Sequence, residues 1–259
     1  MATNVVVRAF VAAAVLGATL PVLASGGGDL PFSFKPDTGN MASLQRGARN
    51  YMNYCAGCHS LKYLRYNRLG KDLEIPEASL RQHLMFTSDK VGDHILSSMP
   101  RGSQDPTVPS DSEKWFGRAP PDLSLTARER GPDWIYSYLL SFYIDASRAT
   151  GVNNLVLPGV SMPHVLGDLQ GWQKHVVEAP TEGDHGGGHH KPKLEIVIKG
   201  ALTPAEYKDF VADLTNFMVY AAEPGRNQRI ALGVPVLAFT VLFGLFAWLL
   251  KREYWKDVH

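Results

Sequence analysis

Apolar residues are unevenly spread along this chain, and the longest apolar runs stand near its two ends. The first run, AFVAAAVLGATLPVLA, is preceded by one charged side chain, Arg8, and closes on a Val22, Ala24 pattern of the kind that signal peptidase reads. This order is typical of a secretory signal peptide. We predict a signal peptide over residues 1–24 and an exported chain starting near Ser25, with a retained membrane anchor as the alternative.

The second run extends from Ile230 to Leu250 and contains no charged residue. At ~1.5 Å per residue it would span roughly 31 Å, which matches the hydrocarbon core of a bilayer. We predict a transmembrane helix over residues 229–251, a cytoplasmic tail over residues 252–259, and a domain over residues 25–228 in the periplasm of a bacterium, outside its cytoplasmic membrane. This orientation rests on the basic and aromatic residues at the end of the run: Trp248, Lys251, Arg252, Tyr254, Trp255 and Lys256.

Three stretches of the exported domain have helical periodicity. Apolar residues recur at helical spacing from Leu44 to Cys55, with Ser43 as a candidate N-cap. GPDWIYSYLLSFY has Pro132 at a first helical position. TPAEYKDFVADLTNFMVYAAEP opens with a capping box, Thr203 and Glu206. The chain also contains 24 Gly and 17 Pro, so we predict a mainly α fold with long loops.

The charge balance narrows the classes of partner. The formal net charge is +1 at pH 7, whereas nucleic-acid-binding domains usually carry a clear basic excess, so no nucleic-acid partner is expected. Residues 25–228 are slightly acidic, which would suit a basic protein partner.

The candidate chemistry lies in YMNYCAGCHSLKY, which contains the only two cysteines of the chain. A Cys-x-x-Cys disulfide closes almost no loop and is a poor structural bridge. A redox pair needs a preceding strand, and a zinc site needs a second ligand pair, but the next histidines, His83 and His94, are distant. Cys-x-x-Cys-His is the attachment signature of a c-type haem. We predict one haem c, bound covalently by Cys55 and Cys58, with His59 as an axial ligand of its iron.

A methionine opposite the histidine is the usual sixth ligand of an electron-transfer haem. Met52 and Met218 lie on helical apolar stripes and are interpreted as core residues. Met99 in SSMPRG and Met162 in GVSMPHV both precede a proline in a loop context. Spacing alone does not decide between Met99 and Met162.

Four stretches resemble the cytochrome c1 family, the haem subunits of the ubiquinol–cytochrome c oxidoreductase (cytochrome bc1) complex. They are RGARNYMNYCAGCHSLKYLRY, FGRAPPDLSLTARER, LPGVSMPHVLGD and FMVYAAEPGRNQR, and one transmembrane helix follows them. The resemblance covers most of the mature chain in the family's order. It implies a cytochrome c-type haem domain, with Met162 as the sixth ligand. It also implies that Arg130 pairs with a haem propionate; Arg128 is the neighbouring choice, and a solvated arginine is the plainer interpretation.

The resemblance further implies a role in the respiratory chain. The chain would transfer one electron at a time from the Rieske iron–sulfur protein to a soluble or anchored c-type cytochrome, with no catalytic acid, base or nucleophile of its own. Cytochrome b and the Rieske protein would be its partners in the membrane, in a dimeric complex. The oxidoreductase activity would belong to the whole complex.

Three other functions remain open: a free-standing anchored cytochrome that serves another oxidase or dehydrogenase, a haem sensor or peroxidase with an open sixth site, and a structural anchor with a disulfide. Residues 185–190 belong to a histidine-rich insert that departs from the family pattern. Its HGGG lacks the G-x-S-x-G element of a hydrolase, so we interpret it as an exposed insert without chemistry.

Overall fold

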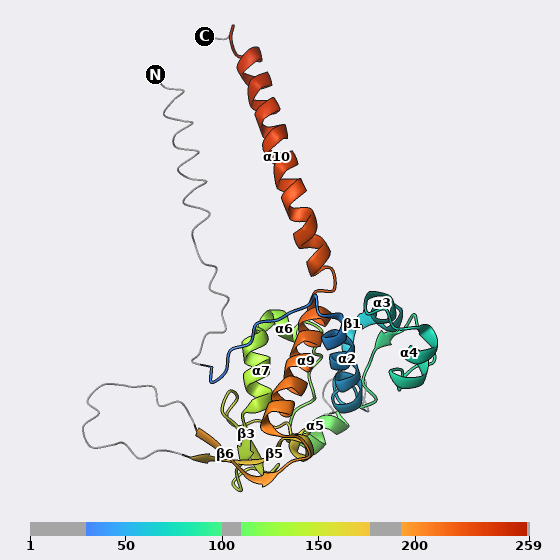
Figure 1. The fold of residues 1–259 in the computed structure, drawn as a ribbon, viewed down its shortest axis with the longest axis vertical. Coiled ribbons are helices and arrows are strands. Elements are labelled where there is room, and N and C mark those ends of the chain that lie inside the picture. Colours follow the sequence, from blue (N-terminus) through green and yellow to red (C-terminus); the bar gives the residue numbers. More distant parts are fainter. Residues whose placement is uncertain (1–29, 100–109, 177–192, 258–259) are drawn as a thin grey trace, which may run out of the picture.

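Two helices that are far apart in the sequence cross at the centre of the folded domain. The computed structural model of the chain describes residues 30–99, 110–176 and 193–257. Within these ranges, α2 (Met41–Tyr54) lies against α9 (Pro204–Ala222), as the cytochrome c-type fold requires (Figure 1). The expected signal peptide, residues 1–24, and the histidine-rich residues 185–190 lie outside the described residues.

Gly47 allows α2 and α9 to approach this closely. A Cβ atom at Gly47 would lie 2.1 Å from the carbonyl oxygen of Asp213 and 2.6 Å from the Cβ of Phe217. Real Cβ atoms do not come this near to backbone oxygen, so only glycine fits. The Asp213 carboxylate then accepts hydrogen bonds from Arg46 Nε and from Ser43 Oγ, both at 2.6 Å, across the same crossing.

The N-cap of α2 differs from the sequence prediction. Asn40 is the N-cap, and its side chain accepts the backbone N–H of Ser43 at 3.1 Å. Ser43 lies inside the helix, where its hydroxyl bonds to Asp213 and accepts from Asn216 of α9. The prediction of Ser43 was wrong because this hydroxyl is used between helices, which a local pattern does not reveal.

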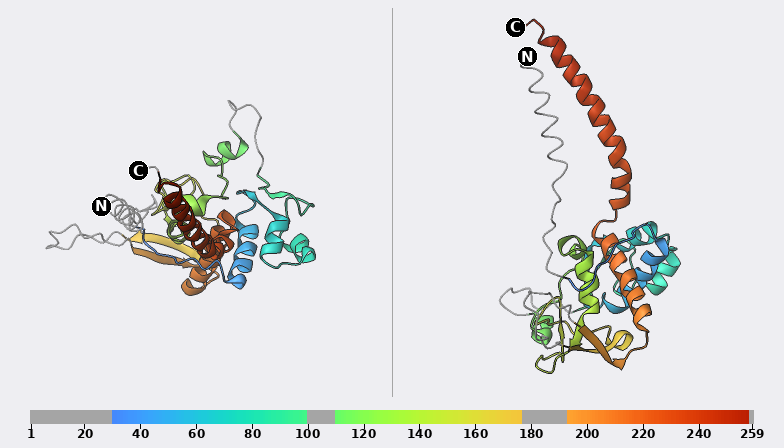
Figure 2. Two further views of the ribbon diagram at one scale, coloured as in Figure 1. Left: turned by 90° about the horizontal axis from the view of Figure 1, so that it is seen from above. Right: turned by 60° about the vertical axis from the view of Figure 1, so that its left-hand side comes forward.

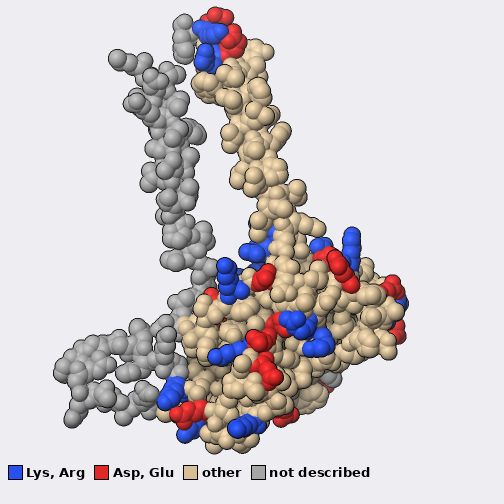
Figure 3. Space-filling view, viewed as in Figure 1, with Lys and Arg blue, Asp and Glu red and all other residues tan. Residues whose placement is uncertain are grey.

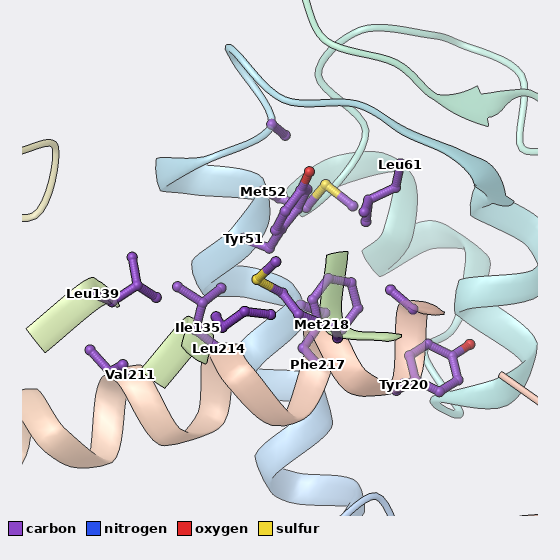
Figure 4. Close-up of a cluster of buried hydrophobic side chains, with 14 of the residues drawn as sticks. Tyr51, Met52, Leu61, Ile135, Leu139, Val211, Leu214, Phe217, Met218 and Tyr220 are labelled. Carbon is purple, nitrogen blue, oxygen red and sulfur yellow. The ribbon is translucent and has the colours of Figure 1, made fainter. Parts of the chain in front are cut away.

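The other two predicted helix starts are confirmed. α7 (Pro132–Leu140) begins with its proline at the first position. α9 begins with the complete capping box, in which Glu206 N donates to Thr203 Oγ1 and Thr203 N donates to Glu206 Oε2. Figure 4 shows that α2, α7 and α9 together enclose the core, in which Met52 and Met218 are 3% and 4% exposed. Both methionines are therefore core residues, as interpreted from the sequence.

Short elements occupy the stretches that the sequence analysis left as loops. Three antiparallel two-stranded sheets pair β1 with β2, β3 with β4, and β5 with β6. Small helices lie between them, and α3 and α4 form a lobe beside α2 (Figure 2). The strands are β1 (Leu61–Arg65), β2 (His94–Ile95), β3 (Phe142–Ile144), β4 (Val152–Asn154), β5 (Gly171–Val176) and β6 (Lys193–Lys199); the helices are α3 (Tyr66–Asp72), α4 (Glu77–His83), α5 (Asp111–Phe116), α6 (Thr126–Glu129) and α8 (Gly167–Gln170).

The last helix, α10 (Arg226–Tyr254), stands clear of the rest of the described chain (Figures 1 and 2). Its 29 residues give a length of roughly 43 Å, enough to cross a bilayer, and it is the candidate membrane span by length and composition. Uncharged side chains cover it between charged groups at its two ends (Figure 3). The expected span, residues 229–251, lies within this helix.

The junction between α9 and α10 is fastened by side chains. Arg229 Nε donates to Glu223 Oε1 at 2.7 Å. Asn227 exchanges two hydrogen bonds with Thr38, one with its carbonyl oxygen at 3.1 Å and one with its hydroxyl at 3.0 Å. The anchor is thus connected to the N-terminal segment as well as to α9.

Candidate functional site

The two cysteines and the histidine lie on one turn at the end of α2. Cys55 is the C-cap of this helix, and its carbonyl oxygen accepts from Cys58 N at 3.0 Å and from His59 N at 2.8 Å. Both thiols are free and half-buried. We call residues 55–59 the attachment loop.

The environment of the thiols disfavours a redox disulfide. Burial raises the pKa of Cys55 to about 12 and also raises the pKa of Cys58, so both stay protonated near neutral pH. The C-terminus of α2 adds a negative helix-dipole end beside Cys55, whereas redox cysteines usually sit at a helix N-terminus, which stabilises the thiolate. In the described ranges, no group of three or more His, Cys, Asp or Glu side chains could hold a zinc ion.

His59 is held in the orientation that an axial ligand needs. Its Nδ1 lies 2.7 Å from the carbonyl oxygen of Pro121, which can only accept, so Nδ1 carries the proton. The lone pair of Nε2 is then available to a metal ion. Burial lowers the pKa of His59, which keeps the ring neutral, and the Tyr51 hydroxyl donates to the His59 carbonyl at 2.9 Å.

The PPDLS stretch holds the Pro121 carbonyl in place through a ladder to β1. Lys62 N donates to Asp122 Oδ2 at 2.9 Å, and Leu123 N donates to Ser60 O at 2.9 Å. Tyr63 N donates to Ser124 Oγ at 3.2 Å. Sequence reasoning missed this role of Pro121 because the contact is made by its backbone, to which residue identity gives no clue.

Met162 lies beside α7. Its side chain is half-buried against the core cluster, and the hydroxyl of Tyr138 donates to its Sδ at 3.4 Å. A thioether sulfur has two lone pairs, so this bond leaves one for a metal ion. No sequence pattern indicated this contact, because Tyr138 and Met162 are 24 residues apart on different elements.

Met99 has different surroundings. It follows Ser98, whose hydroxyl donates to the carbonyl oxygen of Gly57 at 3.2 Å. This bond ties the Met99 segment to the attachment loop itself. Met99 is not among the half-buried side chains that pack against the core in the described part of the chain, whereas Met162 and Cys55 are.

Arg130 is the C-cap of α6, two residues before α7 begins, and its guanidinium stands 5.5 Å from the ring centre of Trp134. Its side chain is 54% exposed, and within the described residues its one ion pair, with Glu129, is 3.8 Å long. Arg128 instead acts on Glu223, whose pKa is lowered first by Arg229 and further by Arg128. Of the two arginines, Arg130 is thus the one whose guanidinium keeps most of its hydrogen-bond donors available, next to the ring of Trp134 in α7.

The donor set fits a covalently bound haem: two free thiols, an imidazole with an available Nε2 and a half-buried thioether. Together with the helix crossing and α10, these residues define a class, that of c-type haem proteins with a helical membrane anchor.

Known proteins agree with this class. The model of the "Cytochrome C1 family" matches residues 32–171 and 199–258. Cytochrome c1 of Allochromatium vinosum is 50% identical over 95% of this chain and 96% of its own length. The "Ammonia monooxygenase gamma subunit" of Nitrosomonas europaea is 43% identical over 86% of each chain, and cytochrome c1 of Rhodospirillum rubrum is 30% identical over 83% of this chain and 81% of its own. The chain belongs to the cytochrome c1 family.

Family membership confirms the cytochrome c-type fold class with one C-terminal membrane-spanning candidate, the covalent haem c, and electron transfer as part of the cytochrome bc1 complex. It favours this function over a free-standing cytochrome. The family model leaves residues 172–198 unmatched, which agrees with the departure from the family pattern noted around the histidine-rich insert.

Proposed function

We propose that this chain receives single electrons from the Rieske iron–sulfur subunit and delivers them to a soluble or anchored c-type cytochrome. The observation that carries the proposal is the attachment loop, where two free thiols adjoin an imidazole whose Nδ1 is already bonded to Pro121 O. Cys55 and Cys58 would form the thioether bonds, and His59 Nε2 and Met162 Sδ would be the axial ligands. When bound, the haem supplies reversible one-electron chemistry at its iron.

The protein's own contribution is to fix the ligands and to shield them from water. Pro121 O fixes the His59 tautomer, and its hydrogen bond makes Nε2 a better donor. The Tyr138 hydroxyl orients the Met162 sulfur and withdraws some of its electron density. Two protein ligands leave no open position for a diatomic or peroxide substrate, which disfavours a sensor or a peroxidase.

Arg130 is the proposed partner of a haem propionate. A guanidinium that stacks on Trp134 and has one long ion pair retains most of its hydrogen-bonding capacity. Replacement by Lys should weaken the contact, because a bidentate carboxylate contact needs the planar fork.

The partners follow from membership in the complex. Cytochrome b would surround α10, and the complex would be a dimer. The slightly acidic exported domain would attract a basic acceptor, and such attraction should weaken as salt is added.

The visible spectrum of the complex in isolated membranes tests the ligand assignment. Met162→Leu should lose the low-spin spectrum and bind CO, whereas the matched control Met99→Leu should keep the low-spin spectrum. The opposite result would assign the sixth position to Met99. Cytochrome b and the Rieske subunit should be purified together with the tagged chain; their absence would support the free-standing cytochrome.

The topology is a further part of the proposal. We propose that residues 1–24 are removed as a signal peptide, that residues 25–228 are periplasmic, that residues 229–251 cross the membrane, and that residues 252–259 are cytoplasmic. Three basic side chains at the far end of α10 support this orientation, namely Lys251, Arg252 and Lys256. A protease added to intact spheroplasts should digest the haem domain, and N-terminal sequencing should begin near Ser25. Protection of that domain would reverse the orientation.

A further inference from the structure

The loop that carries Met162 is anchored at both ends by buried side chains. Val160 and Leu166 are 4% and 2% exposed, and we call residues 160–166 the methionine loop. Between these anchors, Val165 N donates to Pro163 O and Gly167 N donates to His164 O. The loop therefore has a turn of its own, with His164 directed into the protein.

His164 makes its close contacts through its ring. Its imidazole stacks on Phe142 at a centroid distance of 4.7 Å and an interplanar angle of 7°. The ring of Trp172 meets it edge-on at 5.8 Å and 87°. Its buried Nε2 makes no hydrogen bond of normal geometry, and the Gln170 side chain and the Gly171 backbone lie near the imidazole, so the close ring contacts are those with Phe142 and Trp172. The packing is tight, because a Cβ atom at Gly167 would come within 3.1 Å of Trp172 and 3.3 Å of His164.

The same Phe142 ring supports the residue that holds the Met162 sulfur. Tyr138, which donates to Sδ, contacts Phe142 at 5.1 Å and 72°, and it stacks on Trp134 at 5.0 Å and 8°. The aromatic row thus runs from α7 through Phe142 of β3 to His164 and then to Trp172 of β5. Phe142 therefore packs between two rings. One is the ring of Tyr138, whose hydroxyl bonds to the Met162 sulfur, and the other is the imidazole of His164 in the methionine loop.

We propose that His164 is a positioning residue: its ring, stacked on Phe142, holds the methionine loop so that the Met162 sulfur stays at the Tyr138 hydroxyl. Met162 and His164 are separated only by Pro163, whose ring restricts the backbone, so a displacement of His164 passes directly to Met162. The inference rests on the proposed role of Met162 as sixth ligand, and it adds a second support to the hydrogen bond from Tyr138.

The test compares ring and non-ring replacements in the complete membrane complex. His164→Leu fills the space without ring faces, and His164→Phe keeps the ring without the ring nitrogens. We expect His164→Leu to bind CO about tenfold faster than wild type, a difference of ~1.4 kcal/mol, and to lose intensity in the far-red methionine–iron(III) band. His164→Phe should keep the band and the wild-type rate. Leu80→Ala, a buried substitution in α4, controls for general destabilisation and should leave both readouts unchanged.

Each outcome decides the inference. Wild-type rate and band in His164→Leu would overturn it, and so would equal losses in His164→Leu and His164→Phe, because stacking would then not be the cause. If His164→Leu does not accumulate, Trp172→Leu removes the other ring contact of His164 and should also weaken the far-red band; an unchanged band would overturn the inference.

The variant Met162→Leu distinguishes this inference from the proposed function. An unchanged low-spin spectrum in Met162→Leu would overturn both. A changed spectrum in Met162→Leu, with wild-type behaviour in His164→Leu, would overturn only this inference.

Discussion

The attachment loop and the methionine loop hold their proposed haem-binding side chains by different means. In the attachment loop, the two thiols and the imidazole lie within five residues, on a turn continuous with α2, and backbone hydrogen bonds hold the loop. In the methionine loop, a single sulfur is held by a hydroxyl from another element and by a row of stacked rings. The first arrangement is encoded locally, and the second exists only after the chain has folded.

This difference has a physical consequence for sensitivity to substitution. Backbone hydrogen bonds survive most side-chain changes, so the attachment loop should fail mainly when the helix beneath it moves. The methionine loop depends on side-chain contacts worth ~1 kcal/mol each, so single replacements should loosen it without unfolding the domain.

The largest effect is expected at the helix crossing under the attachment loop. Gly47→Ala places a methyl group against the Asp213 carbonyl and should destabilise the fold by about 3 kcal/mol or more, because the clash is with backbone. The amount of haem-stained chain in membranes and its thermal midpoint measure this. Gly92→Ala is the matched control, since a Cβ atom there meets nothing within 4 Å. Equal stability of the two variants would contradict the account of the crossing.

A smaller effect is expected at Asp122, in the PPDLS stretch that is hydrogen-bonded to β1. Asp122→Ala removes the acceptor for Lys62 N and for Ser124 N and should cost about 1–2 kcal/mol of stability. Asp122→Asn keeps one oxygen acceptor and should recover part of the loss. The thermal midpoint gives the size of the effect, and the far-red methionine band should stay unchanged. A weakened band would mean that the two loops are coupled through this segment.

On the methionine side, Tyr138→Phe removes one hydroxyl and leaves the aromatic row intact. The reduction potential should fall by about 40 mV, since a neutral hydrogen bond is worth ~1 kcal/mol and it withdraws electron density from the ligand sulfur. Potentiometric titration of the haem measures this. Tyr136→Phe, whose ring stacks on Phe34 instead, is the control. A potential equal to that of the control would mean that the hydroxyl does not act on the ligand.

The smallest effect is expected in α9, which packs against α2 and α7. Thr203→Ala removes the N-cap and should lower stability by ~1 kcal/mol without a change of spectrum or potential. Thr203→Ser keeps the hydroxyl and should restore the midpoint. A spectral change in Thr203→Ala would show that the helix start reaches one of the ligands.

The features that depend on residues close in the sequence could be predicted, and those that depend on contacts between separate elements could not. The attachment loop, the start of α7 and the capping box of α9 were all predicted, because each depends on residues a few positions apart. The N-cap of α2 was wrong, since Ser43 bonds to a helix from the far end of the domain. Tyr138, Pro121 O and the stacking of His164 were missed for the same reason. Their partners come from other elements, and spacing along the chain contains no record of them.

The fastened junction between α9 and α10 has a consequence for how the partners arrive. With Arg229 bonded to Glu223, and Asn227 bonded to Thr38, three exposed hydrogen bonds together favour one orientation of the domain on its stem. A stem fixed in the bilayer then presents the same side of the domain at a constant height above the lipid. Electron donors and acceptors must come to that height by themselves, so collisions become a search within a thin layer of water along the membrane surface.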